Sequence, residues 1–333
     1  MSNIRDVAKL ANCSIATVSR VLSQDDSFSI SEIKKQEIYD AVNKLNYTPR
    51  NYQKRINIGC IMSITVDKYS DPFFTSILSA MEEECNNVGA TISMIRKYNE
   101  LQNPRILQEM FDANLQGIII MEKLPDELFK LIENKIPNIL FIDNQEVVHE
   151  FDGIGFDHTI ANWQVMNHLI DCGYRRIALI SGSDTKIPLD KSVRMLCYRE
   201  ALRRNNIPYD ESLIKDCNWD MSICEKQVKE VMNLDNPPDA IFAGSDSLAS
   251  CILGTLYSMH YICPDDVGVI GFNNLPTSVH MIPPLTTINV PTYDIGIAAI
   301  RRMMEMIKGK NINKRKILFP TKLVERESTR RVK

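Results

Sequence analysis

Apolar residues near the start of the chain recur at helical spacing. Four of them stand at i, i+3, i+4 and i+7, which predicts a short helix with one buried face; they are Ile4, Val7, Ala8 and Ala11. Asn12 follows, and asparagine tolerates the left-handed backbone of a tight turn. Ser14 is then suited to cap a second helix that runs from Ile15 to Leu22.

The second helix has its own apolar side, and a third helix is expected after Ser31. The side of the second helix that should face the first carries Val18, Val21 and Leu22. The predicted core side of the third helix consists of Ile33, Ile38, Val42 and Leu45. Two short helices joined by a turn and braced by a third are typical of a helix-turn-helix unit.

The outward face of the second helix has a composition that suits the major groove of DNA. This face carries Ile15, Ala16, Thr17, Ser19 and Arg20. Arginine can fork onto a guanine, hydroxyls can bond phosphates or bases, and small apolar groups can touch thymine methyls. The same spacing also suits the solvated face of a small helical bundle, so the pattern alone leaves both interpretations open.

From Asn57 onward, short apolar β-rich runs alternate with helical patterns. The alternation begins with NIGCIMSI and continues through NILFID, then DGIGFD, RRIALISG, DAIFAGSD and DVGVIGFN, with amphipathic segments between them. Alternation of this kind predicts parallel sheets covered by helices on both faces. The expected fold is an all-α helix-turn-helix head followed by an α/β body of two doubly wound lobes.

Ligands of doubly wound folds bind at the carboxyl ends of the strands. Polar and aromatic residues stand at the predicted strand ends or soon after them: Asp71, Phe73, Phe74, Asp143, Asp157, Trp219, Ser245, Asp246, Asn273 and Asn274. Amides, carboxylates and hydroxyls bond sugar hydroxyls, while aromatic rings offer a flat apolar face. Phe73 and Phe74 could equally be simple packing residues at a helix start.

Charge and composition exclude several classes of protein. The net charge is −3, but residues 1–56 carry nine Lys/Arg against six Asp/Glu, so a basic head precedes an acidic body. The nine cysteines form no C-x-x-C pair, which suits a reducing cytoplasm. We expect a cytoplasmic protein without a signal peptide, a cofactor or a metal site. Phosphate-binding loop, hydrolase and zinc-protease motifs are absent from the sequence, so no enzyme is expected.

The beginning of the chain resembles the lac repressor/galactose repressor family. IRDVAKLANCSIATVSRVL at 4–22 and LNYTP at 45–49 carry its head signature, D-V-A-x-x-A-x-x-S-x-x-T-V-S-R-V. The resemblance implies that Ile15, Ala16 and Arg20 read bases. It gives Ser14, Thr17, Ser19 and Asn46 phosphate or framework roles. Two departures from the family pattern are Asn12-Cys13 at the turn and a slightly long SQDDSFSIS loop.

The family's hinge is shortened in this chain, since PRNYQKRINIGCIM reaches the first body strand almost at once. Ile56 could be an apolar wedge for the minor groove or could already belong to the strand. Arg50, Lys54 and Arg55 are expected phosphate contacts. The expected domains are 1–49 for the head, 50–57 for the hinge and 58–333 for the body. Within the body, lobe one covers 58–155 and 288–318, and lobe two covers 156–287 and 319–333.

The family resemblance continues through the body, in blocks such as DPFF, VRMLCYREAL, VGVIGFNN and LVERESTR. It implies that Arg194 grips sugar hydroxyls, that Asn273 holds the main hydroxyl-binding position, and that Trp219 stacks on the sugar. Ser245 or Asp246 would add a bond, and Asn273 stands where the family more often has Asp. A surface salt bridge is the alternative for Arg194.

A repressor of carbohydrate-utilisation genes is the function that the resemblance implies. Its partners would be operator DNA, a galactose-like or β-galactoside effector between the lobes, and a second copy of the chain, because palindromic operators require a two-fold protein. A periplasmic-type sugar carrier is the rival, since its two-lobed body would look the same. The basic head argues against that rival.

Overall fold

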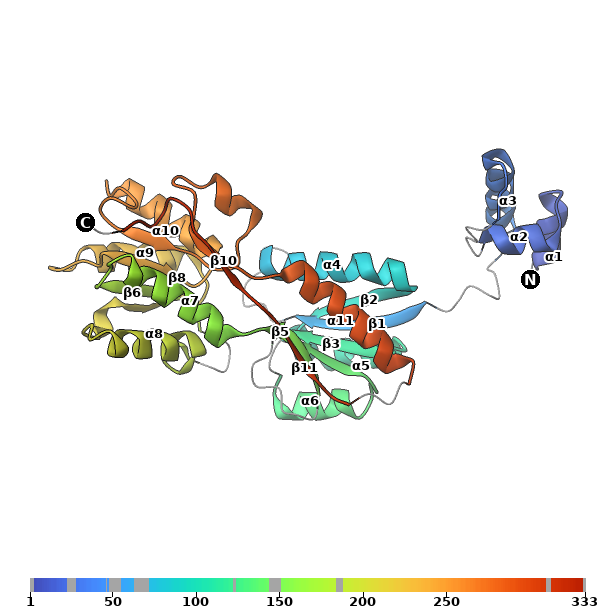
Figure 1. Ribbon diagram of the computed structural model, residues 1–333. Coiled ribbons are helices and arrows are strands. Elements are labelled where there is room, and N and C mark those ends of the chain that lie inside the picture. Colours follow the sequence, from blue (N-terminus) through green and yellow to red (C-terminus); the bar gives the residue numbers. More distant parts are fainter. Residues whose placement is uncertain are drawn as a thin grey trace. The chain divides into compact units, whose positions relative to one another are not determined.

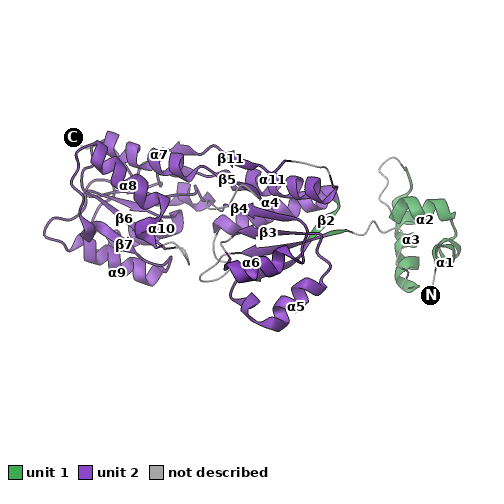
Figure 2. Cartoon of the chain, turned by 90° about the horizontal axis from the view of Figure 1, so that it is seen from below, with its two compact units in different colours: residues 1–56, 89–91 green, residues 57–88, 92–333 purple. Residues whose placement is uncertain are grey.

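The computed structural model describes residues 3–22, 28–45, 47, 55–62, 72–121, 124–143, 151–183, 188–309 and 313–331 (Figure 1). It divides into two units, residues 1–56 with 89–91 and residues 57–88 with 92–333 (Figure 2). We call residues 1–56 the head and residues 57–333 the body. Asn46, Arg50, Lys54 and Asp71 lie outside the described residues.

Three helices form the head: α1 (Ile4–Leu10), α2 (Ile15–Leu22) and α3 (Glu32–Lys44). Asn3 and Asp6 form a capping box at the start of α1, and Asn12 takes the predicted left-handed turn with φ 46°. Val7, Val18 and Ile38 are fully buried where the three helices meet. The pattern of apolar positions therefore predicted this unit correctly, with one exception.

The exception is Ile33, which was expected in the core of the head and is 76% exposed. It precedes Ile38 by five positions, and at about 100° per residue this turns its side chain far from the buried face. The buried face of α3 consists of Ile38 and Ala41, with Val42 and Leu45 partly buried beside them.

Lobe one of the body is built on a six-stranded sheet in the order β11-β5-β4-β3-β1-β2. The strands are β1 (Ile56–Met62), β2 (Ala90–Lys97), β3 (Gly117–Met121), β4 (Ile139–Ile142), β5 (Asp152–Phe156) and β11 (Lys316–Phe319). The four pairs from β1–β3 to β5–β11 are parallel. Every residue of β3, β4 and β5 is buried, as expected for strands covered on both faces.

The helices of lobe one are α4 (Pro72–Val88), α5 (Pro104–Asp112), α6 (Asp126–Glu133) and α11 (Thr292–Ile307), with a short 3-10 turn at Glu100–Gln102. Helices α4 and α11 pack side by side. Gly296 permits this close approach, because a Cβ there would lie 2.5 Å from the backbone oxygen of Ile77. The same packing brings the first turns of α4 and α11 together.

Lobe two has a four-stranded parallel sheet in the order β7-β6-β8-β9. Its strands are β6 (Ile177–Ser181), β7 (Ile214–Asp216), β8 (Ala240–Ala243) and β9 (Gly268–Ile270). Its helices are α7 (His158–Asp171), α8 (Val193–Arg204), α9 (Met221–Met232) and α10 (Asp246–Ser258). Short 3-10 turns lie at Leu189–Lys191, Glu211–Leu213 and Pro276–His280.

The chain passes between the lobes three times. It does so after β5, after β10 (Thr287–Asn289) and after β11, and β10 pairs antiparallel with β12 (Lys322–Val324). These passages place the carboxyl ends of strands from both lobes beside one another. Among the described helices, none is long and apolar enough to cross a membrane.

Candidate functional site

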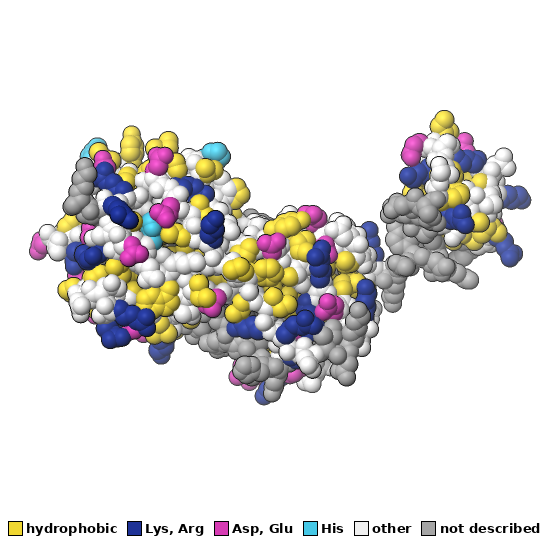
Figure 3. All heavy atoms as spheres, in the orientation of Figure 1, with side chains coloured by type: hydrophobic (Ala, Val, Ile, Leu, Met, Phe, Trp, Pro, Cys, Tyr) yellow, Lys and Arg dark blue, Asp and Glu magenta, His cyan; other side chains and the backbone are white. Residues whose placement is uncertain are grey.

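The second helix of the head presents most of the residues expected to read DNA. Ile15, Ala16, Ser19 and Arg20 are exposed, while Val18 and Val21 of the same helix are buried. Figure 3 shows Lys and Arg side chains spread over the visible described surface of the head. The helix thus offers one apolar face to the head's core and one mixed polar face to the outside.

Ser14 caps this helix as the sequence predicts. Its Oγ accepts a hydrogen bond from the backbone N–H of Thr17 at 3.0 Å, and the two hydroxyls lie 2.8 Å apart. Thr17 is half-buried and its hydroxyl already bonds Ser14. This pair therefore has a structural role in fixing the start of α2.

Arg20 packs against an aromatic ring of the head. Its guanidinium carbon lies 5.2 Å from the centre of the Phe28 ring. A ring at this distance attracts the cation and orients the planar guanidinium. The exposed fork at the end of α2 suits the bidentate recognition of a guanine.

Two candidates near the hinge fall within the described residues. Arg55 is exposed. Ile56 is the first residue of β1, is half-buried, and donates its backbone N–H to Gly89 O at 3.3 Å. Of the two alternatives for Ile56, a wedge for DNA or a strand residue, the structure has the strand residue.

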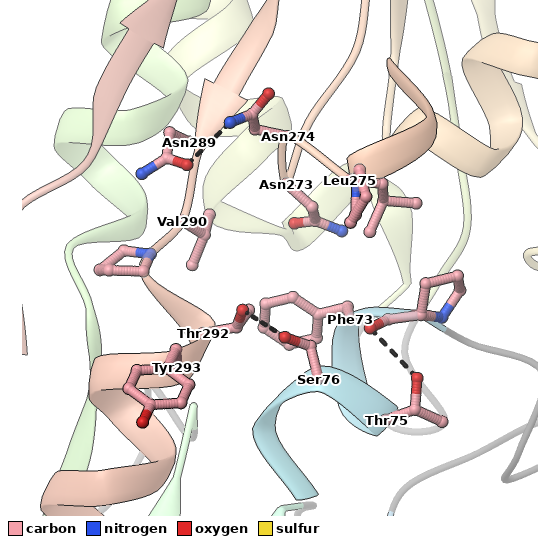
Figure 4. A pocket seen from close by; sticks show the side chains of 13 residues that line it. Phe73, Thr75, Ser76, Asn273, Asn274, Leu275, Asn289, Val290, Thr292 and Tyr293 are labelled. Carbon is pink, nitrogen blue, oxygen red and sulfur yellow. Dashed lines mark hydrogen bonds between the residues drawn. The ribbon is translucent and has the colours of Figure 1, made fainter. Parts of the chain in front are cut away.

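A cavity of about 480 Å³ opens between the two lobes of the body. It is lined by Pro72, Phe73, Thr75, Ser76, Asn273, Asn274, Leu275, Pro276, Asn289, Val290, Pro291, Thr292 and Tyr293. Asn273 and Leu275 follow β9 and face Phe73 and Ser76 of α4 across the cavity (Figure 4). All thirteen lining side chains are uncharged, and every polar one among them carries an amide or a hydroxyl.

Two hydrogen-bonded pairs shape the polar part of this cavity. On lobe one, Ser76 Oγ and Thr292 Oγ1 lie 2.8 Å apart, which links the first turns of α4 and α11. Near β10, the side-chain amide of Asn274 donates to Asn289 Oδ1 at 2.9 Å. Asn273 takes a φ of 105° and bonds Ile288 O through its backbone N–H. This strained turn holds the Asn273 side chain at the cavity.

Arg194 and Trp219 belong to a separate cluster in lobe two. Arg194 donates to Ser181 Oγ, and its guanidinium carbon lies 5.7 Å from the Trp219 ring and 5.2 Å from the Phe272 ring. Trp219 donates its indole N–H to Ser183 O at 3.1 Å and has a φ of 61°. Arg194 is thus partly buried beside a hydroxyl and two aromatic rings of lobe two.

Three further candidates have local structural roles. Phe74 is half-buried, and its ring meets that of Phe73 edge to face at 5.1 Å. Asp157 caps α7 by accepting the N–H of Ile160 at 3.0 Å. Ser245 caps α10 by accepting the N–H of Leu248 at 3.2 Å. None of these three lines the large cavity.

Asp246 is fully buried and bonds its own chain. Its carboxylate accepts hydrogen bonds from Thr287 Oγ1 at 2.6 Å, from Ser278 Oγ and from the backbone N–H of Leu275 at 2.7 Å. Burial raises the pKa of this carboxyl, and the three donors oppose that shift. These contacts tie α10 to the segment that carries Asn273, so Asp246 supports the cavity from behind.

A second, small cavity lies where β4 and β5 end. Asp143, with a φ of 55°, bonds His158 Nε2 through Oδ1 at 2.6 Å. His158 is the first residue of α7 and stacks on Phe156 at 3.9 Å. This contact joins the sheet of lobe one to the first helix of lobe two.

Sequence reasoning missed several residues of the large cavity, above all Ser76, Asn289 and Thr292. Asn289 ends the strand β10 and Thr292 begins α11, so their positions at an element boundary were a signal. Within the described ranges, no group of three or more His, Cys, Asp or Glu side chains is arranged to hold a metal ion.

Comparison with known proteins matches both parts of the chain. Residues 3–50 match the family described as bacterial regulatory proteins, lacI family, and residues 166–329 match the periplasmic binding protein-like domain. The HTH-type transcriptional repressor MelR of Bacillus subtilis is 26% identical, with 98% of this chain and 97% of that protein covered. The repressor PurR of Photobacterium profundum is also 26% identical, with 99% of each covered.

Solved structures share the fold. The lac repressor dimer bound to operator and the anti-inducer ONPF has a TM-score of 0.76 at 22% identity, with 99% of each chain covered. The complex of the transcriptional regulator CelR with cellobiose has a TM-score of 0.73 at 24% identity, with 98% of this chain and 100% of that chain covered.

The head and the body thus match two parts of one known architecture, and the matches run the length of the chain. Proteins with this architecture are DNA-binding regulators, and the chain is not an enzyme. It belongs to the lacI family of bacterial regulatory proteins, as a DNA-binding transcriptional repressor with a helix-turn-helix head and a periplasmic-binding-protein-like body.

Proposed function

We propose that this repressor controls carbohydrate-utilisation genes and that a neutral sugar, bound in the cavity between the lobes, changes its affinity for an operator. The observation that carries the proposal is the lining of that cavity, which is uncharged and combines amides and hydroxyls with the Phe73 ring. Sugar hydroxyls both donate and accept, as amides do. A phosphorylated sugar would need a cation, and the described residues that line the cavity supply none.

The identity of the sugar is the finer part of the proposal. A galactose-like sugar or a β-galactoside is the first candidate, from the resemblance to the galactose repressor branch. Two proteins with this fold support a sugar of some kind. One is the CelR complex with cellobiose, and another is a LacI family regulator from Enterococcus faecium with bound ribose, at 20% identity and a TM-score of 0.73.

The contacts proposed for the sugar fall into two groups. Phe73 and Asn273 line the cavity directly and supply an apolar face and an amide. Arg194 and Trp219 belong to the neighbouring cluster of lobe two and would reach the sugar when the lobes close on it. Asp157 and Ser245 support the helix starts, and Asp246 supports the turn that carries Asn273.

On the DNA side, α2 enters the major groove of each operator half-site. Ile15, Ala16 and Arg20 contact base edges, while Ser19 and Arg55 contact phosphates. The protein works in the cytoplasm as a homodimer, because a palindromic operator requires two heads related by a two-fold axis. The lac repressor was solved as a dimer on its operator, which supports this arrangement.

Control follows from a shift between lobe arrangements. A ligand that bonds both lobes favours the arrangement in which its contacts are complete, and the bound sugar thereby changes the population that fits the operator. Two features connect the lobes and could change when they move. The chain passes between the lobes three times. Asp143, which follows β4 in lobe one, bonds His158 of α7 in lobe two. Any sugar that distinguishes the two arrangements alters operator affinity.

A ligand panel tests the proposal. Purified full-length protein is heated with galactose, lactose, cellobiose, ribose, glucose 6-phosphate and hypoxanthine, and operator affinity is measured with each. A neutral sugar should raise the melting temperature and change operator affinity, because a ligand specific to the native state stabilises it. Asn273→Gly should weaken that response and keep the fold, because glycine tolerates a φ of 105°.

The other outcomes separate the parts of the proposal. If hypoxanthine acts and no sugar does, the sugar assignment is wrong and a purine regulator remains, in line with the PurR relatives. If glucose 6-phosphate acts alone, the uncharged lining has been misinterpreted. If nothing changes operator affinity, control by a small ligand in this cavity is lost while DNA binding stands.

A further inference from the structure

One wall of the large cavity ends a row of hydrogen bonds that begins at Arg326. Arg326 follows β12 and is half-buried. Its Nη1 donates to Leu285 O at 2.6 Å, and its Nη2 donates to Asn274 Oδ1 at 2.7 Å. The amide of Asn274 in turn donates to Asn289 Oδ1 at 2.9 Å (Figure 4). Among the described residues, Asn274 and Asn289 line the cavity and Arg326 does not. We call Arg326, Asn274 and Asn289 the amide relay.

Arginine fixes the direction of this relay. A guanidinium group carries only donors, so the Asn274 atom that it contacts must be the carbonyl oxygen. The nitrogen of the Asn274 amide therefore faces Asn289, and Asn289 must accept with its own oxygen. Turning either amide end for end would set one N–H group against another. Both amides consequently have a single favourable orientation.

This orientation decides what Asn289 offers to a ligand. Its oxygen is occupied by Asn274, and among the described residues none accepts a hydrogen bond from its amide nitrogen. A cation that bonds one amide oxygen also polarises the amide, and the effect passes along a row of hydrogen bonds. The relay thus presents the N–H groups of Asn289 as strengthened donors at the cavity.

The wall on lobe one lacks such a fixed direction. Ser76 Oγ and Thr292 Oγ1 lie 2.8 Å apart, and either hydroxyl can be the donor. Hydroxyl hydrogens rotate to suit their partners, so this pair can meet a donor or an acceptor of the ligand. Only the wall formed by the relay therefore discriminates between the two.

We propose that Arg326 is a positioning residue of the cavity, and that the Asn289 amide which it orients binds a ligand hydroxyl through the oxygen of that hydroxyl. The inference rests on the proposed function of the cavity as a sugar site. The ligand hydroxyl acts there as an acceptor, and its own hydrogen points elsewhere. Without Arg326 the two amides are free to turn, and the wall loses its preference for an acceptor.

The first test needs no ligand. Arg326→Met and Asn289→Ala are made separately and together, and denaturant unfolding is followed by the fluorescence of Trp163 and Trp219, which both lie in lobe two. The two substituted residues communicate through Asn274. The unfolding equilibrium constant of the double variant should be about threefold or more below the value that independent effects predict. Independent effects overturn the proposal.

A matched control uses another arginine of the same segment. Arg330 pairs with Asp265 at 2.5 Å, and both side chains are about half exposed. Arg330→Met removes the same charge four positions further on, and its effect should be independent of Asn289→Ala. Coupling of equal size for Arg330→Met would show that any loss of charge from this segment acts on Asn289, which contradicts the role given to Arg326.

The second test reverses the relay. Asn274→Asp keeps an acceptor for Arg326 and removes the N–H group that faces Asn289. The Asn289 amide should then turn to donate to the new carboxylate, and its oxygen becomes the atom offered to the ligand. This variant replaces an amide by a carboxylate that pairs with the arginine, so it should fold even where Arg326→Met does not.

Galactose is the probe, together with its monodeoxy and deoxyfluoro derivatives, because fluorine can accept a hydrogen bond but cannot donate one. At one ring position the deoxyfluoro sugar should bind about three- to tenfold more tightly than the deoxy sugar. Asn274→Asp should abolish this advantage. An advantage that persists in the variant overturns the proposal. If galactose does not bind at all, the galactose assignment fails, and the ligand-free comparison of Arg326→Met with Asn289→Ala still decides whether the relay exists.

Discussion

The DNA-reading helix and the inter-lobe cavity are both candidate binding sites, but they are built in different ways. The reading face of α2 consists of neighbours within eight residues, and its geometry follows from one helix and one cap. The cavity joins the first turn of α4 to the turn after β9, the end of β10 and the start of α11, which follow about 200 residues later in the chain. A local site can be deduced from spacing, whereas a site assembled from distant segments depends on how the lobes pack.

The largest effect expected from a single change concerns the support of the cavity. Asp246→Ala removes the acceptor of three donors, those of Leu275, Ser278 and Thr287. Unpaired buried donors are costly, so the free energy of unfolding should fall by about 3 kcal/mol or more. Denaturant unfolding measures the loss. If stability is unchanged while sugar binding disappears, Asp246 is a ligand residue and the structural role assigned to it is wrong.

The next effect concerns the reading face itself. Arg20→Ala should weaken binding to the operator by about 1 to 3 kcal/mol and hardly change binding to random duplex DNA, because a guanine contact carries sequence information. Lys9→Ala removes the same charge from the exposed side of α1 and should affect both duplexes alike. Titration at fixed salt measures both variants. An equal loss on both duplexes for Arg20→Ala makes this side chain a phosphate contact.

A smaller effect tests whether the cap of α2 positions this helix for DNA binding. Ser14→Ala removes the acceptor of the Thr17 N–H and should destabilise the head by about 1 kcal/mol, with weaker operator binding. Ser31→Ala removes the equivalent cap of α3, where Ser31 Oγ accepts the Lys34 N–H at 3.3 Å. It should cost similar stability with less effect on the operator. Equal losses of operator affinity would show that the cap of α2 has no special role in reading.

The smallest effect is a pH dependence of the stability of the body, which carries the histidines. All five histidines lie in the body, and burial lowers the pKa of His168. In the unfolded chain His168 takes up a proton near its ordinary pKa of about 6.5, whereas in the folded chain it does so only at lower pH. The free energy of unfolding therefore falls as the pH drops below about 6.5. Melting curves at pH 7 and pH 5.5 should differ less for His168→Gln than for the unsubstituted protein. An unchanged difference excludes His168 as a cause.

The head could be predicted from the sequence more completely than the cavity of the body. In the head, the sequence pattern predicted three helices, the cap at Ser14 and the turn at Asn12, and it failed at Ile33, where the apolar residue lies off the buried face. In the body, apolar runs predicted the parallel strands of both lobes, but three-residue β7 has too little pattern to detect.

The cavity was predicted only in part, since Phe73 and Asn273 line it while Asp246 lies behind it. The position of a polar residue at a strand end is visible in the sequence. Whether its side chain points to a ligand or to its own backbone depends on tertiary packing, as the bonds from Leu275 and Thr287 to Asp246 show.

Selection of duplexes by the full-length protein shows whether α2 reads a DNA sequence. The protein is mixed with a random duplex library at moderate salt, and the retained sequences are determined for the unsubstituted chain and for Arg20→Ala. The unsubstituted chain should enrich a two-fold symmetric sequence, and the variant should lose its preference at one base pair per half-site. Retention of DNA without any sequence preference would contradict sequence-specific binding by α2.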